Sequence, residues 1–213
     1  MFMTVIRHGE SYVNVIGTQV KSMDSALTEK GQDQAMALDE WFKAQNHFAD
    51  VLYTSTMRRA LETTGYLADT LCADPIQEHR LREIPNVYAG GEIVLPENMA
   101  RKHASDWANK APFIPRAVDI EGSESWMHFR IRVGQFMDDM VKNHMNQNVY
   151  VVAHGGVISA MFDNVFNVGP HRRADVHNYN TSWSRFQYRD GIREHWYLWD
   201  HNRVDHLIGK DLL

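Results

Sequence analysis

Cysteine is almost missing from this sequence of 213 residues, in which Cys72 is the only one. A single cysteine excludes an internal disulfide bond and a zinc site built from several cysteines. Since Cys72 follows an apolar helical stretch that ends at Leu71, we expect its side chain to lie in the core. The absence of disulfides also fits a reducing compartment. We therefore expect a cytoplasmic protein.

Long apolar runs and strong charge of one sign are missing as well. No segment approaches the roughly 18 consecutive apolar residues of a membrane span, and the N-terminus lacks the basic and long apolar regions of a secretion signal. The formal net charge is −5, and no run of five basic residues occurs. Such runs are typical of nucleic-acid-binding segments. We expect neither a membrane nor a nucleic acid as partner, so any affinity for anions must come from a local cluster of Arg, Lys and His.

What the sequence does contain is an alternation of short apolar runs and amphipathic stretches from residue 2 to about residue 166. This alternation is typical of an α/β fold, in which helices cover both faces of a mostly parallel sheet. The length and the hydrophobic fraction of 44% suit one domain over residues 1–213. A hairpin at the sheet edge is expected around Asp190-Gly191. The expected strands are 2–6, 50–53, 75–83, 148–153, 181–188 and 192–199.

Polar residues mark where the main helices should begin. Thr28 is the expected cap of one helix, and residues 54–56 are the expected cap of the next. Ser123 or Ser125 should cap the longest helix, at about 125–146, and another helix is expected at 157–166. The tail from residue 202 to 213 is expected to be poorly packed at its end.

Residues 84–122 break this regular pattern. They are rich in Pro, Gly and Asn, and they include aromatic side chains, so we expect an inserted, ordered lid with a short helix near 97–109. Basic residues of this segment are candidates to bind a second acidic group of a substrate, although a solvated charged surface is the simpler interpretation of each. These candidates are Arg101, Lys102, Lys110 and Arg116, together with Lys21 in an earlier loop.

Histidine followed by glycine stands at the end of two expected strands, at His8 and at His154. If both strands are central and parallel, the two histidines meet at the carboxyl edge of the sheet, where α/β folds bind their ligands. Arg7 and an arginine from the first turn of the helix near residue 58 would join them. Glu83 ends a third extended segment and could reach the same pocket. The sequence therefore predicts an anion site with two histidines, two arginines and one carboxylate.

Seven segments resemble, in order and spacing, the motifs of the histidine phosphatase superfamily in its phosphoglycerate mutase-like branch (branch 1). The resemblance covers most of the chain and implies a three-layer α/β/α sandwich. The segments are RHGES at 7–11 with Asn14, LTEKGQ at 27–32 with Ala35, STMRRALET at 55–63, LRE at 81–83, GSES at 122–125 with Phe129 and Arg132, VAHGG at 152–156, and NTS at 180–182.

The resemblance implies that His8 is a nucleophile that forms a phosphohistidine. His8 would attack as a neutral imidazole, with its other ring nitrogen donating to a backbone carbonyl. Glu83 would first protonate the leaving oxygen and then accept a proton from the attacking water.

Phosphate binding falls, by the same resemblance, to Arg7 and Arg59, which can make bidentate, charge-assisted hydrogen bonds. His154 would add a donor in its protonated form, as would the Asn14 side chain and the backbone N–H of Gly155 at a helix N-terminus. We expect no metal and no other cofactor, because the arginines supply the positive charge. The expected partner is a small phosphorylated substrate.

Three alternatives to this phosphatase stay open at this stage. A cofactor-dependent mutase is disfavoured because the acid segment, REIPN at 82–86, lacks the NERHYG stretch typical of those mutases. The same departure weakens the case for Glu83, with Glu10 and Glu92 as alternative acids. A non-catalytic phosphate-binding protein would normally have lost part of the residue set. A metal site is the third alternative, but the histidines near the C-terminus lack a tight ligand spacing: His195, His201 and His206.

Overall fold

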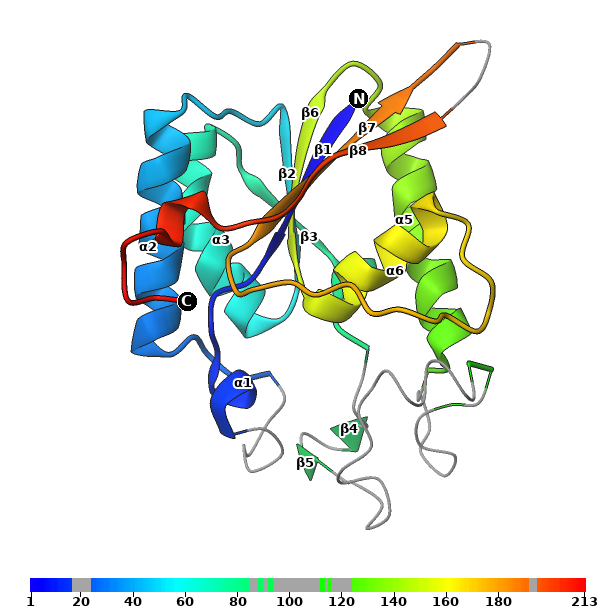
Figure 1. The fold of residues 1–213 in the computed structure, drawn as a ribbon, viewed down its shortest axis with the longest axis horizontal. Helices are drawn as coiled ribbons and strands as arrows, with labels where there is room; N and C mark the ends of the chain where they lie inside the picture. Colours follow the sequence, from blue (N-terminus) through cyan, green and yellow to red (C-terminus); the bar gives the residue numbers. More distant parts are fainter. Residues whose placement is uncertain are drawn as a thin grey trace.

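A six-stranded sheet runs through the middle of the computed structural model (Figure 1). The structure describes residues 1–16, 24–84, 88–89, 92–93, 112–113, 115, 124–191 and 195–213. From one edge to the other, the strands are β3 (Pro75–Glu78), β2 (Val51–Ser55), β6 (Asn148–Ala153), β1 (Phe2–Arg7), β7 (Trp183–Arg189) and β8 (His195–Arg203).

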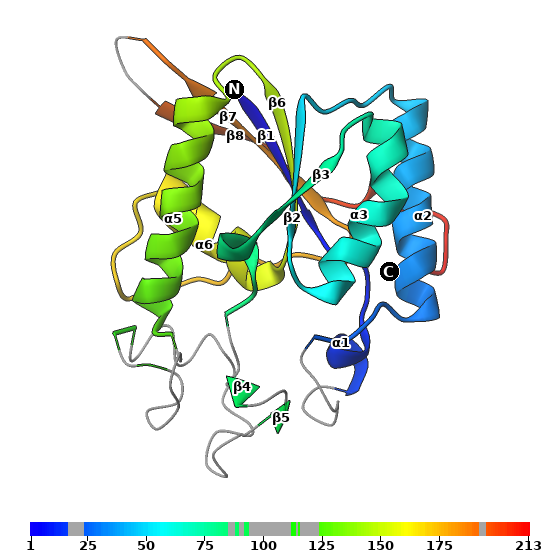
Figure 2. The same ribbon diagram turned by 180° about the vertical axis from the view of Figure 1, so that it is seen from behind.

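Helices cover both faces of this sheet, as Figure 2 shows from behind. The helices α2 (Glu29–Ala44) and α3 (Arg58–Leu71) lie on one face, and α5 (Trp126–Asn143) and α6 (Gly155–Val165) lie on the other. The predicted three-layer α/β/α architecture is confirmed. The smaller elements are α1 (Tyr12–Ile16), the two 3-10 turns η2 (His79–Leu81) and η3 (Asp205–Leu207), and the pair β4 (Tyr88–Ala89) and β5 (Glu92–Ile93).

The order of the strands places the two histidine motifs side by side. β1 pairs with β6 in parallel, with Arg7 opposite Ala153. The next residues, His8 and His154, therefore leave the sheet together at its carboxyl edge. β2 and β3 continue the parallel part, whereas β7 and β8 form the predicted antiparallel hairpin at the edge.

Alternation along the strands builds two cores. Val5 packs into the cluster under α5 and α6, and Ile6 packs into the cluster under α2 and α3. Both side chains are fully buried, and each burial of this kind contributes roughly 1.5–3 kcal/mol. The strand ends that carry the site are thus held from both faces.

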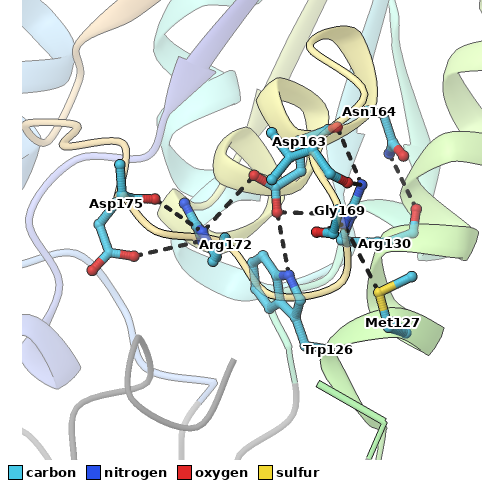
Figure 3. A network of polar contacts seen from close by, with 10 residues as sticks. Trp126, Met127, Arg130, Asp163, Asn164, Gly169, Arg172 and Asp175 are labelled. Carbon is cyan, nitrogen blue, oxygen red and sulfur yellow. Dashed lines mark hydrogen bonds and ion pairs between the residues drawn. The ribbon is translucent and has the colours of Figure 1, made fainter. Parts of the chain in front are cut away.

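Helix α6 also joins α5 through a buried polar network, which Figure 3 shows. The Asp163 carboxylate lies 3.7 Å from Arg130 Nε and 3.8 Å from Arg172 Nε, and it accepts a hydrogen bond of 3.2 Å from Trp126 Nε1. Arg130 also donates to the backbone carbonyl of Asp163 in α6 and to those of Val168 and Gly169 after it. We call these four side chains, Trp126, Arg130, Asp163 and Arg172, the Asp163 network.

The helix caps follow the prediction at two of three positions. Thr28 Oγ1 accepts from the backbone N–H of Gly31, and Ser125 Oγ accepts from that of His128. The expected cap at residues 54–56 was wrong, because α3 has Met57 at its N-cap and no side-chain cap.

One other expectation about packing was wrong. Cys72 is exposed, because it adopts a left-handed conformation (φ 55°) that ends α3. The end of the C-terminal tail is largely exposed, as expected, at residues 208–211 and 213. Before it, Leu207 is fully buried, and the carbonyl of Leu212 accepts a hydrogen bond of 2.7 Å from Gln34 on α2.

The predicted lid at 84–122 falls largely outside the described residues, and so does the helix expected at 97–109. Within the lid, β4 and β5 form a short antiparallel pair. Among the described residues, no helix is long and apolar enough to cross a bilayer.

Candidate active site

His8 follows β1 directly and is buried, with a relative exposure of 3%. Its Nδ1 lies 2.6 Å from the carbonyl oxygen of Gly9. A carbonyl oxygen only accepts, so Nδ1 carries the proton and Nε2 keeps its lone pair. Gly9 is required here because a Cβ at this position would lie 2.4 Å from the carbonyl oxygen of Gly31.

Arg59, in the first turn of α3, reaches back over the end of the sheet to His8. Its Nε donates to His8 Nε2 over 2.9 Å, which is compatible only with an unprotonated Nε2. Burial lowers the pKa of His8 well below 6.5, and the positive charges of Arg59 and Arg7 lower it further. The imidazole is therefore neutral near pH 7, as a nucleophile must be.

Arg7 ends β1 and points its guanidinium into the same buried region. Its Nη1 donates to the carbonyl oxygen of Asn178, whereas its Nε has no hydrogen-bond partner among the described residues. Burial lowers the pKa of Arg7, with Glu83 opposing this shift and Arg59 adding to it. The guanidinium still remains protonated at every physiological pH.

His154 lies opposite His8, with ring centroids 5.1 Å apart and an interplanar angle of 60°. Its Nε2 is 2.8 Å from Ser55 Oγ, and its buried Nδ1 has no partner in the described part of the chain. Burial, followed by the charge of Arg59, lowers the pKa of His154 well below 6.5. The protonated form expected from the resemblance is thus disfavoured until an anion enters the pocket.

Glu83 comes to the pocket after η2, not directly from a strand end as we had expected, because β3 stops at Glu78. Its Oε2 accepts from the backbone N–H of Gly156 over 3.0 Å, and its Oε1 accepts from the N–H of Ile84 over 2.9 Å. Gly156 makes this approach possible, since a Cβ there would lie 2.2 Å from Oε1. The carboxylate therefore sits at the N-terminus of α6, two residues from His154.

The alternative acids are placed differently. Glu10 Oε1 accepts from Thr28 Oγ1 over 2.8 Å and so braces the start of α2. Glu92 belongs to β5, and its side chain lies outside the description. Of the two carboxylates whose side chains the structure describes, Glu10 and Glu83, Glu83 is the one whose contacts reach the histidine motif at 152–156.

Asn14 and Gly155 lie at the rim of this cluster. Asn14 Oδ1 accepts from Asn180 Nδ2 over 3.3 Å, and the same Nδ2 donates to the carbonyl oxygen of His8 over 3.0 Å. Asn14 is thus linked to His8 indirectly, through the side chain of Asn180. A Cβ on Gly155 would lie 3.8 Å from Arg7 Nε, so the start of α6 adjoins that guanidinium.

The structure brings Arg7, His8, Arg59 and His154 together, with Glu83 beside them. The predicted specificity residues Lys21, Arg101 and Lys102 lie outside the described residues, as do Lys110 and Arg116.

Sequence reasoning missed two side chains that position the site. Thr63 Oγ1 accepts from the backbone N–H of Gly9 over 3.0 Å, and Ser55 holds His154. Their signals were present: Thr63 lies one helical turn after Arg59, and Ser55 ends a central parallel strand.

No group of three or more potential metal ligands (His, Cys, Asp or Glu) occurs within the described ranges. Two of the C-terminal histidines have hydrogen-bond partners instead. His201 Nδ1 lies 3.1 Å from Ser184 Oγ, and His206 Nε2 lies 2.9 Å from Thr181 Oγ1.

Comparison with known proteins agrees with this geometry. The model of the histidine phosphatase superfamily (branch 1) matches residues 3–199. The chain belongs to this superfamily. A similar relative is phosphoserine phosphatase 1 of Hydrogenobacter thermophilus, 30% identical over 75% of this chain and 74% of that protein. A 2,3-bisphosphoglycerate-dependent phosphoglycerate mutase of Staphylococcus saprophyticus is 25% identical over 78% of this chain and 85% of its own length.

Solved structures agree on the fold of this family member. YhfR of Bacillus stearothermophilus has a TM-score of 0.75 and 25% identity, covering 97% of this chain and 98% of that one. A mutant phosphoserine phosphatase from Entamoeba histolytica, solved in complex with phosphoserine, also has a TM-score of 0.75 at 23% identity, with coverages of 97% and 98%. The predicted enzyme class, a phosphoric monoester hydrolase of the histidine phosphatase type, is confirmed by the family match.

Proposed function

We propose that this protein is a metal-independent phosphatase that hydrolyses a small phosphomonoester through a phosphohistidine on His8. The observation that carries the proposal is the orientation of the His8 ring. Nδ1 donates to Gly9, so the lone pair of Nε2 is directed to the side where Arg59 lies. A neutral nucleophile next to a fixed cation is what attack on a phosphate dianion requires.

When substrate binds, phosphate oxygens replace His8 Nε2 as the hydrogen-bond acceptor of Arg59. The phosphate oxygens take the guanidinium N–H groups of Arg59 and Arg7, which releases the lone pair of His8 Nε2. The buried Nδ1 of His154 gains an acceptor if it is protonated, and the dianion favours that protonation. The backbone N–H of Gly155, at the positive end of α6, adds a further donor.

Transfer then breaks the bond between phosphorus and the leaving oxygen while His8 Nε2 bonds to phosphorus. Glu83 gives its proton to the leaving oxygen, so the alcohol departs neutral. In the second half, water attacks phosphorus as Glu83 takes one of the water protons. The N–P bond breaks, inorganic phosphate leaves, and His8 and Glu83 return to their starting protonation states.

The substrate class includes phosphoserine as the first compound to test, because relatives of this chain carry that substrate in their names. The mutase function is the second candidate, supported by similarity to phosphoglycerate mutases. The acid segment at 82–86 favours hydrolysis, since it lacks the stretch typical of mutases. A cytoplasmic location is part of the proposal and rests on the single free cysteine.

The test uses purified protein with excess chelator, an aryl phosphate and a panel of phosphorylated metabolites. We expect hydrolysis to persist with chelator and to fall by about 10³-fold or more in His8→Ala. His195→Ala, at an exposed position of the edge strand β8, is the matched control and should keep full activity. Activity that survives in His8→Ala, or that disappears with chelator, would overturn the proposal. A product that is an isomeric phosphate ester without free phosphate would indicate the mutase.

A further inference from the structure

The turn that precedes β7, residues 178–182, makes hydrogen bonds to the backbone of Arg7 and of the nucleophile His8. The backbone N–H of Thr181 donates to the carbonyl oxygens of Arg7 and His8, over 3.0 and 3.3 Å. Asn180 Nδ2 adds a third hydrogen bond, of 3.0 Å, to the carbonyl of His8. The backbone position of Arg7 and His8 therefore depends on the conformation of this turn.

That conformation is an uncommon one. Thr181 has φ 55°, in the left-handed region that β-branched residues rarely adopt, and its side chain is fully buried. Such a residue keeps its conformation only when the surrounding structure holds it there. In this fold, holding contacts come from the end of β8 and from the C-terminal segment after it.

His206, in η3, makes the first of these contacts. It is 3% exposed, and its Nε2 lies 2.9 Å from Thr181 Oγ1. The single proton of this hydroxyl is donated to the carbonyl of Asn180 over 2.7 Å, so His206 is the donor through Nε2. Its Nδ1 has no hydrogen-bond partner among the described residues.

Asn202, near the end of β8, makes the second contact. Its Oδ1 accepts from the backbone N–H of Tyr179 over 2.8 Å. Tyr179 directly follows Asn178, whose carbonyl oxygen accepts from Arg7 Nη1. Asn202 itself has φ 53°, and its N–H donates to Ser184 over 3.1 Å, so it is fixed on both sides.

The C-terminal segment is anchored on α2. In Figure 1 it passes from β8 across to the side of α2, where the chain ends. Gln34 on α2 donates to the carbonyl of Leu212 over 2.7 Å, and its Oε1 accepts from the backbone N–H of Glu10 over 2.8 Å. One side chain thus connects the tail to the RHGES motif.

We propose that Asn202 and His206 are positioning residues of the active site. His206 acts through Thr181 on the nucleophile His8, and Asn202 acts through the 178–182 turn on Arg7. The inference rests on the proposed function, in which His8 attacks phosphorus and Arg7 binds the phosphate. It gives the C-terminal segment, far from His8 in the sequence, a defined part in the reaction.

The two positions should differ in their kinetic effects. His206→Ala is expected to lower kcat by about tenfold or more with a small change in KM, because displacement of a nucleophile by about 1 Å slows the chemical step. Asn202→Ala is expected to raise KM, and the inhibition constant of inorganic phosphate, by about threefold to tenfold, because a misplaced Arg7 weakens phosphate binding.

Side-chain length provides the discriminating test for His206. His206→Gln places an N–H donor near the position of Nε2 and should restore most of kcat, whereas His206→Asn reaches only the position of Nδ1 and should not. Leu207→Ala is the matched control. It removes a fully buried neighbour in η3 and should lower the melting temperature while kcat stays within about twofold of wild type.

The outcomes separate this inference from the function itself. If His8→Ala stays active, the proposed function fails first. If His8→Ala is inactive, unchanged kcat in His206→Ala overturns the inference. Equal kcat losses in His206→Ala and Leu207→Ala overturn it too, as does equal activity of the Gln and Asn variants. If His206→Ala does not fold, the comparison of Gln with Asn decides alone.

Discussion

Two regions of this molecule hold arginines away from solvent, and Arg7 in one region differs from Arg130 and Arg172 in the other in where its balancing negative charge comes from. In the Asp163 network (Figure 3), the protein supplies it: Asp163 lies within 4 Å of both Arg130 and Arg172. At the sheet edge, no carboxylate of the described residues forms an ion pair with Arg7.

This difference distinguishes arginines that stabilise the fold from an arginine that is available to bind a ligand. A buried cation that is paired inside the protein contributes to the fold, and breaking the pair is costly. A buried cation without an internal carboxylate partner is suited to an anion from outside. Glu83 is close enough to Arg7 to raise its pKa, but its oxygens are occupied by backbone N–H groups.

The largest expected effect comes from replacing Arg59, one of two neighbouring arginines at the start of α3, by alanine. Arg59→Ala should lower kcat/KM by about 10³-fold or more, because it removes the cation next to His8. Arg58 is the matched control, since its side chain is 63% exposed and pairs with Glu62. Arg58→Ala should stay within about threefold of wild type. Steady-state kinetics measures both variants. Similar losses of kcat/KM in the two would show that Arg59 has no special role beside His8.

The next effect concerns stability. Asp163→Ala leaves the buried Arg130 without its carboxylate and Arg172 with only the exposed Asp175, and it should lower the free energy of unfolding by about 3–5 kcal/mol. Specific activity of the folded protein at 25 °C should change little. Urea unfolding measures the first quantity. Asp175→Asn is the control, because Asp175 lies 3.7 Å from Arg172 but its side chain is 55% exposed, so a change under about 1 kcal/mol is expected.

Stabilisation of the protein by bound phosphate should also distinguish the two regions. Phosphate at 100 times its dissociation constant should stabilise the wild-type protein by about 2.7 kcal/mol, seen as a higher melting temperature. Arg59→Ala should lose this shift, and Asp175→Asn should keep it. Phosphate stabilisation that persists in Arg59→Ala would place the anion elsewhere.

The smallest effect is a pH dependence of stability. His8 and His154 have lower pKa values in the folded protein than the 6.5 of an exposed histidine. Below about pH 6.5 the unfolded chain therefore binds more protons than the folded one. The stabilisation is complete above that pH and is lost as the pH falls toward the folded-state pKa values, by up to about 1.4 kcal/mol per pH unit for each group.

Urea unfolding between pH 7.5 and 5.5 measures this slope. The double variant His8→Asn/His154→Asn should be less sensitive to pH than wild type, whereas His195→Asn, at an exposed position, should match wild type. An unchanged slope in the double variant would mean that these histidines do not titrate as their burial requires.

Sequence reasoning could predict the sheet edge because its signals are local. An apolar run that ends in His-Gly is visible at both His8 and His154, and parallel pairing brings such ends together. The family motifs then singled out Arg59 from the two arginines at the start of the next helix and supported Glu83. His8, His154 and Arg59 occur at strand ends or at a helix start, where short patterns determine the local structure, whereas Glu83 follows the 3-10 turn η2.

Other features depend on contacts between distant segments, and short patterns do not contain them. The expected burial of Cys72 was wrong because helix α3 ends in a left-handed turn that exposes it. The contact between Thr181 and His206 requires β8 to end where it does, and neither residue belongs to a periodic stretch. The same holds for Ser55, expected as a helix cap, which binds His154 instead.

The central claim is that phosphate passes through Nε2 of His8, and trapping that intermediate tests it most directly. The enzyme is mixed with excess substrate, quenched under alkaline denaturing conditions that preserve phosphohistidine, digested and analysed by mass spectrometry. We predict one added phosphoryl group on the peptide that contains His8, and none in His8→Ala. A phosphoryl group on another residue, or turnover with release of phosphate by His8→Ala, would contradict the account.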